Sequence, residues 1–249
     1  MDRSAFHRLF KSPGPVVTPV IHVLGAAQAL RNISTAARLG APGIFLINHD
    51  FPVDQFLPIL REVRAACPDI WLGVNFLAQS GRSAFPVLGQ LAAEGFALDA
   101  YWADDAGMDE RQPTQSEAEA IAAIRDASGW RGLYFGGVCF KKQRPVDPAL
   151  NEHSAHIARP FMEVVTTSGL ATGHAADMDK ITAFRRGLGP APLAVASGIT
   201  PDNAASYAAD VDCFLVATGI NHPGDFYTID PARLAALLDL SRDFGAPRP

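Results

Sequence analysis

Eight short apolar runs alternate with amphipathic segments along the chain, and this alternation limits the possible folds more than any other feature of the sequence. The runs are rich in β-branched and aromatic residues, whereas the segments between them repeat apolar residues at helical spacing. Strands that alternate with helices predict a parallel sheet joined by crossover helices. The predicted strands are Val16–Leu24, Gly43–Ile47, Ile70–Phe76, Ala97–Trp102, Gly132–Phe140, Phe161–Thr166, Leu193–Ala196 and Asp212–Ala217.

The number of strand–helix units favours a closed barrel over an open sheet. The 249 residues match the roughly 250 of one (β/α)8 barrel, and no G-x-G-x-x-G motif follows the first strand. We therefore predict a single-domain α/β fold over residues 1–249, a TIM barrel with eight units in residues 16–245. Residues 1–15 hold a short N-terminal helix, Ser4–Phe10, and a proline-rich break, and we expect the helix to cover the bottom of the barrel.

Two helix starts carry recognisable capping residues. Thr114, with Glu117 three residues later, has the pattern of a capping box. Thr200 followed by Pro201 has the pattern of an N-cap before a proline at the first helical position. The sequence therefore predicts helices that begin at these two threonines.

Charge and cysteine content argue against several classes of protein. The net charge is −5 and no basic run is longer than Lys141-Lys142, so we expect no nucleic-acid partner. Residues 1–11 lack the apolar core of a signal peptide, and no stretch has the roughly 18 apolar residues of a membrane span. We expect a cytoplasmic protein with no membrane partner. The three cysteines are widely spaced, which argues against a disulfide framework.

The most informative stretch is Pro192–Asn221, in which two strand-like runs end in Ser197-Gly198 and Thr218-Gly219. In (β/α)8 barrels the loops after strands seven and eight commonly bind phosphate, because glycine lets backbone N–H groups approach the anion. The sequence therefore predicts a phosphate site at these two pairs. The alternative is that both pairs are ordinary turns.

A glycine-bearing loop after the sixth predicted strand adds to this site. We predict that Ser168, Gly169, Thr172 and Gly173 wrap the ligand and share its phosphate. The alternative is that the loop is a flexible connector.

Polar residues follow other strands at the end of the barrel where active sites of this fold lie. Adjacent strand residues point to opposite faces, and of the pair Asp104-Asp105 we predict that Asp105 faces the barrel axis as an acid or base. Lys141 is predicted to balance phosphate charge, to stabilise an oxyanion or, if desolvated, to form a Schiff base. His49 is predicted to be a general acid or base. The alternatives are capped turns for Asp105 and His49 and a surface position for Lys141.

Further polar side chains near the ends of the second and third strands complete the predicted site. Asn48 and Asn75 are predicted to bind substrate. Glu152, His153 and His156 have a spacing that suggests metal binding, but their helix lies on the outside of the barrel, so we predict no metal site. No motif calls for a cofactor.

Several motifs resemble the BtpA/SgcQ family of TIM-barrel proteins. They are TSGLATG (167–173), ASGITPDN (196–203), FLVATGI (214–220), LGVNFL (72–77) and DAG (105–107). The resemblance implies a TIM barrel with a phosphate site, and the wider group of phosphate-binding barrels shares a similar S-G-x-x-P-x-N pattern. The first strand lacks the family's His-Leu-x-Pro-Leu-Pro-Gly signature, and Asn48-His49 stands where the family tends to have Glu-Asn. The chemistry of this chain is therefore expected to differ.

These patterns lead us to expect an enzyme that acts on a small phosphorylated metabolite of phosphosugar or phosphoribosyl type, as an isomerase, lyase or transferase. The alternative is a non-catalytic binding or assembly factor, since the BtpA family is linked by name to photosystem I biogenesis. We expect a homodimer or larger homo-oligomer, to which an exposed apolar patch at Phe226 and Tyr227 contributes.

Overall fold

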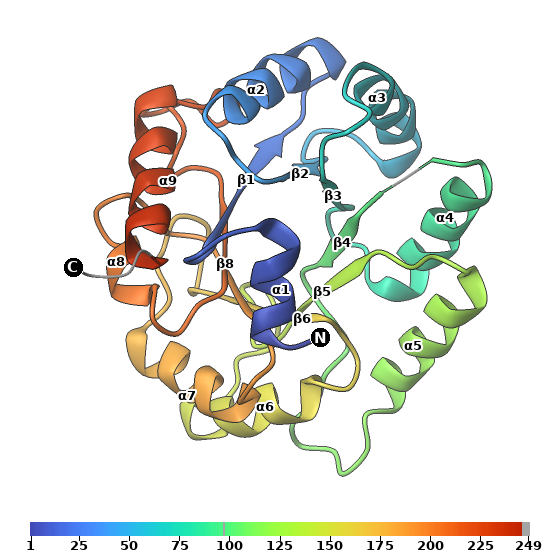
Figure 1. Ribbon diagram of the computed structural model, residues 1–249. Coiled ribbons are helices and arrows are strands. Elements are labelled where there is room, and N and C mark those ends of the chain that lie inside the picture. The colour runs from blue at the N-terminus through green and yellow to red at the C-terminus, as the bar shows by residue number, and fades with distance from the viewer. Residues whose placement is uncertain (97, 246–249) are drawn as a thin grey trace.

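The computed structural model describes residues 1–96 and 98–245, and within them eight parallel strands close into a barrel (Figure 1). The order of strands in the barrel follows the chain, and the last strand pairs with the first. The strands are β1 (Val16–His22), β2 (Ile44–Ile47), β3 (Leu72–Asn75), β4 (Ala100–Ala103), β5 (Leu133–Gly137), β6 (Val164–Ser168), β7 (Leu193–Ala196) and β8 (Cys213–Val216). The predicted TIM-barrel fold is confirmed.

Helices surround the barrel and connect its strands. They are α1 (Arg3–Phe10), α2 (Ala26–Arg38), α3 (Val53–Ala66), α4 (Gly81–Ala93), α5 (Ser116–Ser128), a 3-10 turn η1 (Pro148–Leu150), α6 (Asn151–Ala158), α7 (Met178–Leu188), α8 (Ala204–Tyr207) and α9 (Pro231–Gly245). Figure 1 shows α2 to α9 as a ring around the strands, with α1 across one end of the barrel.

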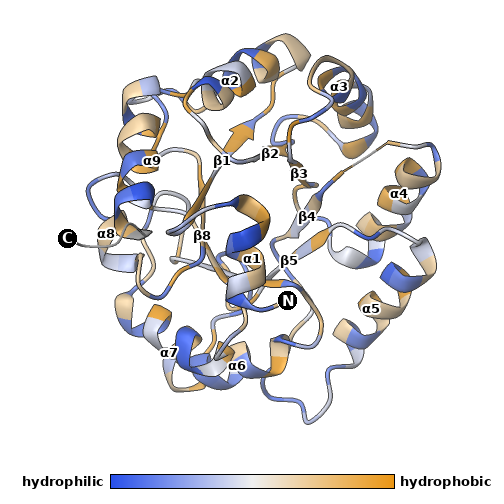
Figure 2. Ribbon diagram, viewed as in Figure 1, coloured by the Kyte–Doolittle hydropathy of each residue, from blue (hydrophilic) through white to orange (hydrophobic). Residues whose placement is uncertain are grey.

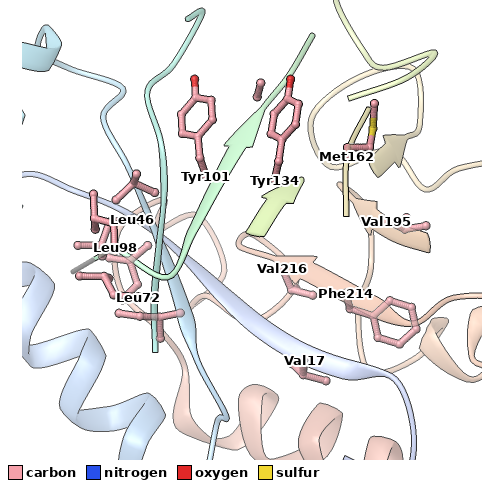
Figure 3. Close-up of a cluster of buried hydrophobic side chains, with 14 of the residues drawn as sticks. Val17, Leu46, Leu72, Leu98, Tyr101, Tyr134, Met162, Val195, Phe214 and Val216 are labelled. Atoms are coloured by element: carbon pink, nitrogen blue, oxygen red, sulfur yellow. The ribbon is translucent and has the colours of Figure 1, made fainter. Parts of the chain in front are cut away.

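The strands are buried on both faces, which explains why they read as continuous apolar runs (Figure 2). Alternate residues such as Val20, Phe45 and Leu215 fill the barrel, and the residues between them pack against the helices. Figure 3 shows part of the outer layer, in which the rings of Tyr101 and Tyr134 lie nearly parallel with their centroids 6.3 Å apart.

Helix α1 closes the end of the barrel at which the strands begin, as predicted. Its Phe6 is fully buried and meets the Phe135 ring inside the barrel at 6.2 Å, and Phe10 meets Trp71 at 4.9 Å. The other end of the barrel, where the strands finish, is left open for a binding site.

Some predicted boundaries differ from the structure. The sixth strand runs over Val164–Ser168 instead of Phe161–Thr166, because the polar Thr167 and Ser168 are buried strand residues. The predicted start of the fourth strand, Ala97, lies outside the described residues.

Both predicted helix starts are wrong. Helix α5 begins after Gln115, and Glu117 binds Arg82 of α4 through two hydrogen bonds of 2.7 and 3.0 Å instead of capping its own helix. Helix α8 begins only at Ala204. The Asn203 side chain accepts a hydrogen bond from the Thr200 amide and donates one to the Gly198 carbonyl, so residues 200–203 form a turn.

Candidate active site

A pocket lies at the carboxyl ends of the strands, at the opposite end of the barrel from α1. Its floor consists of apolar residues inside the barrel, and its rim consists of the loops that follow the strands. The lining residues are Val20, His22, Ile47, His49, Leu77, Trp102, Asp104, Lys141, Lys142, Thr172, Gly173, Ala196, Ser197, Gly198, Ile199, Leu215, Val216, Ala217, Thr218 and Gly219.

The loops after β7 and β8 meet at this pocket, as predicted from their glycines. Ser197 and Gly198 are consecutive residues in the left-handed region, with φ of 73° and 68°. A Cβ on Gly198 would clash with the backbone of residues 174–175 in the loop after β6, and a Cβ on Gly219 would clash with the Ile199 carbonyl. Only glycine permits this contact between the three loops.

The loops after β7 and β8 contribute four backbone amides to this junction. Within residues 1–96 and 98–245, the amides of Gly198, Ile199, Thr218 and Gly219 donate no hydrogen bond to the protein. Clusters of such N–H groups in loops that contain left-handed residues are typical of anion sites. Thr172 and Gly173 line the same side of the pocket.

Lys141 brings a positive charge to these loops. Its Nζ donates hydrogen bonds to Ser197 Oγ at 3.0 Å and to Thr172 Oγ1 at 3.2 Å. Partial burial lowers the pKa of Lys141 from its ordinary value. The side chain therefore reaches from the end of β5 to the loops after β6 and β7.

Ser168 and Gly169 do not line this pocket, although Gly169 lines a second pocket that shares Lys141 and Lys142 with it. Ser168 Oγ accepts a hydrogen bond from the Lys141 amide and donates one to the Gly169 carbonyl, both at 2.8 Å. Gly169 is packed against the backbone of His174 and Ala175. These two residues hold the loops that carry Lys141 and Thr172.

Of the two adjacent aspartates, Asp104 lines the pocket and Asp105 does not, so the predicted orientation of Asp105 is wrong. Trp102 lies inside the barrel, and strand alternation brings Asp104 to the same face. The Asp105 carboxylate is exposed and accepts a hydrogen bond from the Gly107 amide at 2.8 Å, in a local turn.

Asp104 is held in a buried setting. Burial raises its pKa above the ordinary value, although a hydrogen bond from Asn75 Nδ2 to Asp104 Oδ1, at 3.0 Å, opposes this effect. Asn75 is itself buried without lining the pocket, and its Nδ2 contacts Asp104, so its role in substrate binding stays a prediction.

Asn48 is also a structural residue and does not line the pocket. Its Nδ2 donates to the Phe51 carbonyl at 2.7 Å, and its Oδ1 accepts from the Leu77 amide at 3.1 Å. Its amide group therefore connects the loops after β2 and β3.

Two histidines form the side of the pocket near β1 and β2. His49 lines the pocket as predicted, and its ring meets the His22 ring edge-on at 4.7 Å. Burial is the main cause that lowers the pKa of His49. His22 lies at the mouth of the barrel, as its position near the end of the first predicted strand indicates, but the sequence suggested no role for it.

His22 is held by a hydrogen bond to the loop after β8. Its Nδ1 lies 3.0 Å from the Phe226 carbonyl, which can only accept, so Nδ1 carries a proton, and in the neutral ring Nε2 is an acceptor. The Phe226 ring stacks on it at 3.7 Å, and burial lowers the pKa of His22 to about 4. No sequence signal links these residues, which are 204 positions apart.

Phe226 and Tyr227 do not form the exposed patch that we expected. Both are half-buried: Phe226 covers His22, and Tyr227 donates a hydrogen bond to Asp50 at 3.0 Å. Neither residue lines the pocket itself, and Phe226 lies against His22, which does.

Within residues 1–96 and 98–245, no three His, Cys, Asp or Glu side chains are grouped to hold a metal ion. None of the helices in the described ranges has the length and apolar character needed to cross a membrane.

Known structures share the fold at low sequence identity. The tryptophan synthase α subunit from Legionella pneumophila has a TM-score of 0.66 and 14% identity, and the match covers 98% of this chain and 99% of that one. The (S)-3-O-geranylgeranylglyceryl phosphate synthase from Thermoplasma acidophilum, in complex with sn-glycerol-1-phosphate, has a TM-score of 0.64 and 14% identity, with 97% and 98% covered. The phosphoribosyl anthranilate isomerase from Thermus thermophilus has a TM-score of 0.58 and 15% identity, with 92% and 98% covered.

Neither a protein-family model nor a curated protein sequence matches the chain. The structural neighbours are TIM-barrel enzymes, and at these identities they establish the fold alone.

Proposed function

We propose that the protein is an enzyme that binds a small phosphorylated metabolite and moves a proton on it, as an isomerase or lyase does. The observation that carries the proposal is the composition of one pocket. One side offers backbone amides and the Lys141 ammonium, and the other offers Asp104 and two histidines. A transferase that uses the same groups as acid and base is also compatible with this arrangement.

In this proposal the phosphate binds between the loops after β7 and β8. The amides of Gly198, Ile199, Thr218 and Gly219 donate to its oxygens, and Lys141 adds a charge-assisted hydrogen bond. The hydrogen bonds of Lys141 to Ser197 and Thr172 support this position of its ammonium. Binding energy from the phosphate positions the reacting end of the substrate.

Asp104 is the proposed acid and base. Its raised pKa brings the carboxyl closer to the range in which it can exchange a proton near neutral pH. Asn75 holds the carboxyl through the bond to Oδ1, which makes it a positioning residue. His49 is the second candidate for proton transfer, and neutral His22 can accept a hydrogen bond from the substrate through Nε2.

The solved neighbours support the class of substrate by analogy only. Two of their names refer to phosphorylated compounds, and one was solved with sn-glycerol-1-phosphate. A shared fold hosts many activities, so the reaction is argued from the site.

The resemblance to the BtpA/SgcQ family is the basis for an alternative. Its motifs ASGITPDN and FLVATGI contain the loop residues that line the pocket, so a binding or assembly factor could use the same phosphate site without catalysis. The two functions differ in one observable: an enzyme converts a bound metabolite into product, whereas a binding or assembly factor does not.

A panel of phosphorylated metabolites in deuterated water tests the proposal. Proton NMR should show that at least one compound either becomes a new product or exchanges a carbon-bound proton for deuterium. If compounds bind, as judged by a rise in melting temperature, but none reacts or exchanges, the protein is a binding module and the catalytic proposal is wrong.

A further inference from the structure

We propose that Lys142 is a catalytic residue whose ammonium binds the oxygen of a substrate carbonyl as negative charge develops on it, so that the substrate is a phosphorylated aldehyde or ketone. This inference rests on the proposed function, since it names a further residue of the same site and the group on the substrate that this residue binds.

A turn after β5 brings two adjacent lysines to the same pocket. The Gln143 amide donates to the Phe140 carbonyl at 3.1 Å, and Lys142 inside this turn has a left-handed backbone with φ of 67°. Adjacent residues of an extended strand point to opposite faces. Because the turn ends that alternation, both Lys141 and Lys142 line the pocket.

The two ammonium groups differ in their partners. Lys141 Nζ is held by Ser197 and Thr172 on the side of the pocket where the phosphate is proposed to bind. The Lys142 side chain is exposed, and within residues 1–96 and 98–245 it has neither a hydrogen bond nor an ion pair. A substrate can therefore accept a hydrogen bond from Lys142 without breaking a bond to the described part of the protein.

The charge of Lys142 acts on the two groups that are proposed to transfer protons. Burial is the main cause that lowers the pKa of His49, and the positive charge of Lys142 comes next. Burial raises the pKa of Asp104, and Lys142 is among the charges that oppose this rise. All three side chains line one pocket, so the ammonium stands at the end of the substrate where the proton is exchanged.

A cation at this place suits the removal of a proton from carbon. When the Asp104 carboxylate takes a proton from a carbon next to a carbonyl group, the C–H electron pair forms a carbon–carbon double bond and the carbonyl electron pair moves to oxygen. The Lys142 ammonium donates a hydrogen bond to this negative oxygen and keeps its own proton. When a proton returns to the carbon, the electron pair on oxygen re-forms the carbonyl group, and the cycle is observed as exchange of the carbon-bound proton.

Calorimetric titration with inorganic phosphate, glycerol 3-phosphate and 2-phosphoglycolate tests the inference. The carboxylate of 2-phosphoglycolate imitates the negative oxygen of the intermediate, whereas glycerol 3-phosphate has only neutral hydroxyl groups at that end. We expect the wild type to bind 2-phosphoglycolate about tenfold or more tightly than glycerol 3-phosphate, because a charge-assisted hydrogen bond from Lys142 adds to the phosphate contacts. Lys142→Gln should remove this preference and change the affinity for inorganic phosphate by less than about twofold, since salt screens exposed charges.

Lys11→Gln is the matched control. Lys11 is also exposed and left-handed, with φ of 49°, but it lies after α1 at the other end of the barrel, so the preference should persist. Lys142→Arg keeps the charge and should retain most of the preference. On any metabolite that exchanges in the deuterium panel, Lys142→Gln should lower kcat by about 100-fold with little change in KM, as loss of one oxyanion donor does.

The outcomes separate this inference from the proposed function. If the wild type binds inorganic phosphate but does not prefer 2-phosphoglycolate, or if Lys142→Gln keeps the preference, the role of Lys142 is wrong and the phosphate site stands. If Lys142→Gln weakens the binding of inorganic phosphate as much as that of 2-phosphoglycolate, or raises KM without lowering kcat, Lys142 only binds the substrate and the inference is likewise wrong. If none of the three compounds binds, the phosphate site and the inference both fail.

Discussion

Asp104 and Asp105 show how the position of a residue decides its chemistry. The two side chains are identical, but Asp104 is half-buried, bonds to Asn75 and has a raised pKa, whereas Asp105 closes an exposed turn. A carboxyl that exchanges protons with a substrate needs the first environment.

The first prediction uses this pair. Asp104→Asn keeps the shape of the side chain but removes the group that carries the proton, so kcat for the reaction found in the metabolite panel should fall by about 100-fold to 10,000-fold. Asp105→Asn is the matched control and should retain activity within about twofold, because its side chain makes only a local bond. Equal losses in both variants would remove Asp104 from the mechanism.

The sequence could not decide between these two aspartates. All four residues of β4 are apolar and buried, whether they point into the barrel (Ala100 and Trp102) or out of it (Tyr101 and Ala103). Their pattern therefore does not show which of the two following aspartates points inward. By contrast, Lys141 and His49 both line the pocket, because each lies in a loop that follows a strand at this end of the barrel.

The second prediction concerns His22 and pH. Its folded-state pKa of about 4 lies below the ordinary 6.5, so the unfolded chain takes up the proton first as pH falls. The neutral ring therefore stabilises the fold fully above pH 6.5, and this contribution is lost between pH 6.5 and about 4. It should amount to about 2 to 3 kcal/mol.

Urea unfolding of the wild type and of His22→Gln across this pH range measures the contribution. The free energy of unfolding should fall more steeply with decreasing pH in the wild type than in the variant. Parallel curves would mean that His22 titrates normally, contrary to its buried position.

At the scale of elements, the loops after β6, β7 and β8 form the site by packing against one another. Lys180 of α7 supports them, since its Nζ donates to the carbonyls of Cys139 at 2.6 Å and Ser168 at 2.8 Å. Two glycines at close contacts make this packing possible.

The third prediction follows from those contacts. In Gly219→Ala the new methyl group would clash with the Ile199 carbonyl and separate the two loops, so affinity for inorganic phosphate should fall by about tenfold or more. Gly25→Ala is the control, because nothing lies within 4 Å of its added Cβ and its backbone is extended with φ of 171°. Unchanged phosphate affinity in Gly219→Ala would show that the junction of the loops does not bind the anion.

Sequence patterns located these elements better than they located their ends. The Ser-Gly and Thr-Gly pairs after two apolar runs identified the loops after β7 and β8, because a Cβ at either glycine would clash with the backbone of a neighbouring loop. The sixth strand was placed too early, since polar Thr167 and Ser168 read as loop although their side chains are buried. Both predicted helix starts were displaced by side-chain contacts. One is the local bond of Asn203 to Gly198, and the other joins Glu117 to Arg82 of the preceding helix.

At the scale of the whole molecule, the alternation of eight strands with helices was enough to predict the barrel. A buried charge attaches helices to the end of the barrel at which the strands begin, and the sequence did not indicate this charge. Asp212 is fully buried and bonds to Arg3 at 2.7 Å, His7 at 3.0 Å and Arg185 at 3.0 Å. It therefore joins α1 and α7 to the start of β8. Burial alone raises the pKa of Asp212, but hydrogen bonds from His7, the Leu193 amide and Arg3 outweigh it, so the pKa lies below its ordinary value.

The fourth prediction is that Asp212→Asn destabilises the protein by about 3 kcal/mol, since it leaves the buried part of the cluster without its carboxylate. In the wild type this contribution is present above the unfolded-state pKa of about 3.9 and is lost as pH falls through the lower folded-state pKa. Urea unfolding measures both effects.

The control is Asp239→Asn, which removes an exposed ion pair with Arg242 and should change the free energy of unfolding by less than about 1 kcal/mol. An equal effect of the two substitutions would contradict the role of Asp212.

The central claim is that the loops after β7 and β8 and Lys141 bind a phosphate group, and a crystal structure of the protein soaked with inorganic phosphate tests it most directly. The account predicts one anion in contact with the amides of Gly198 and Gly219 and with Lys141 Nζ. An anion bound elsewhere, with these amides turned away from the pocket, would contradict it.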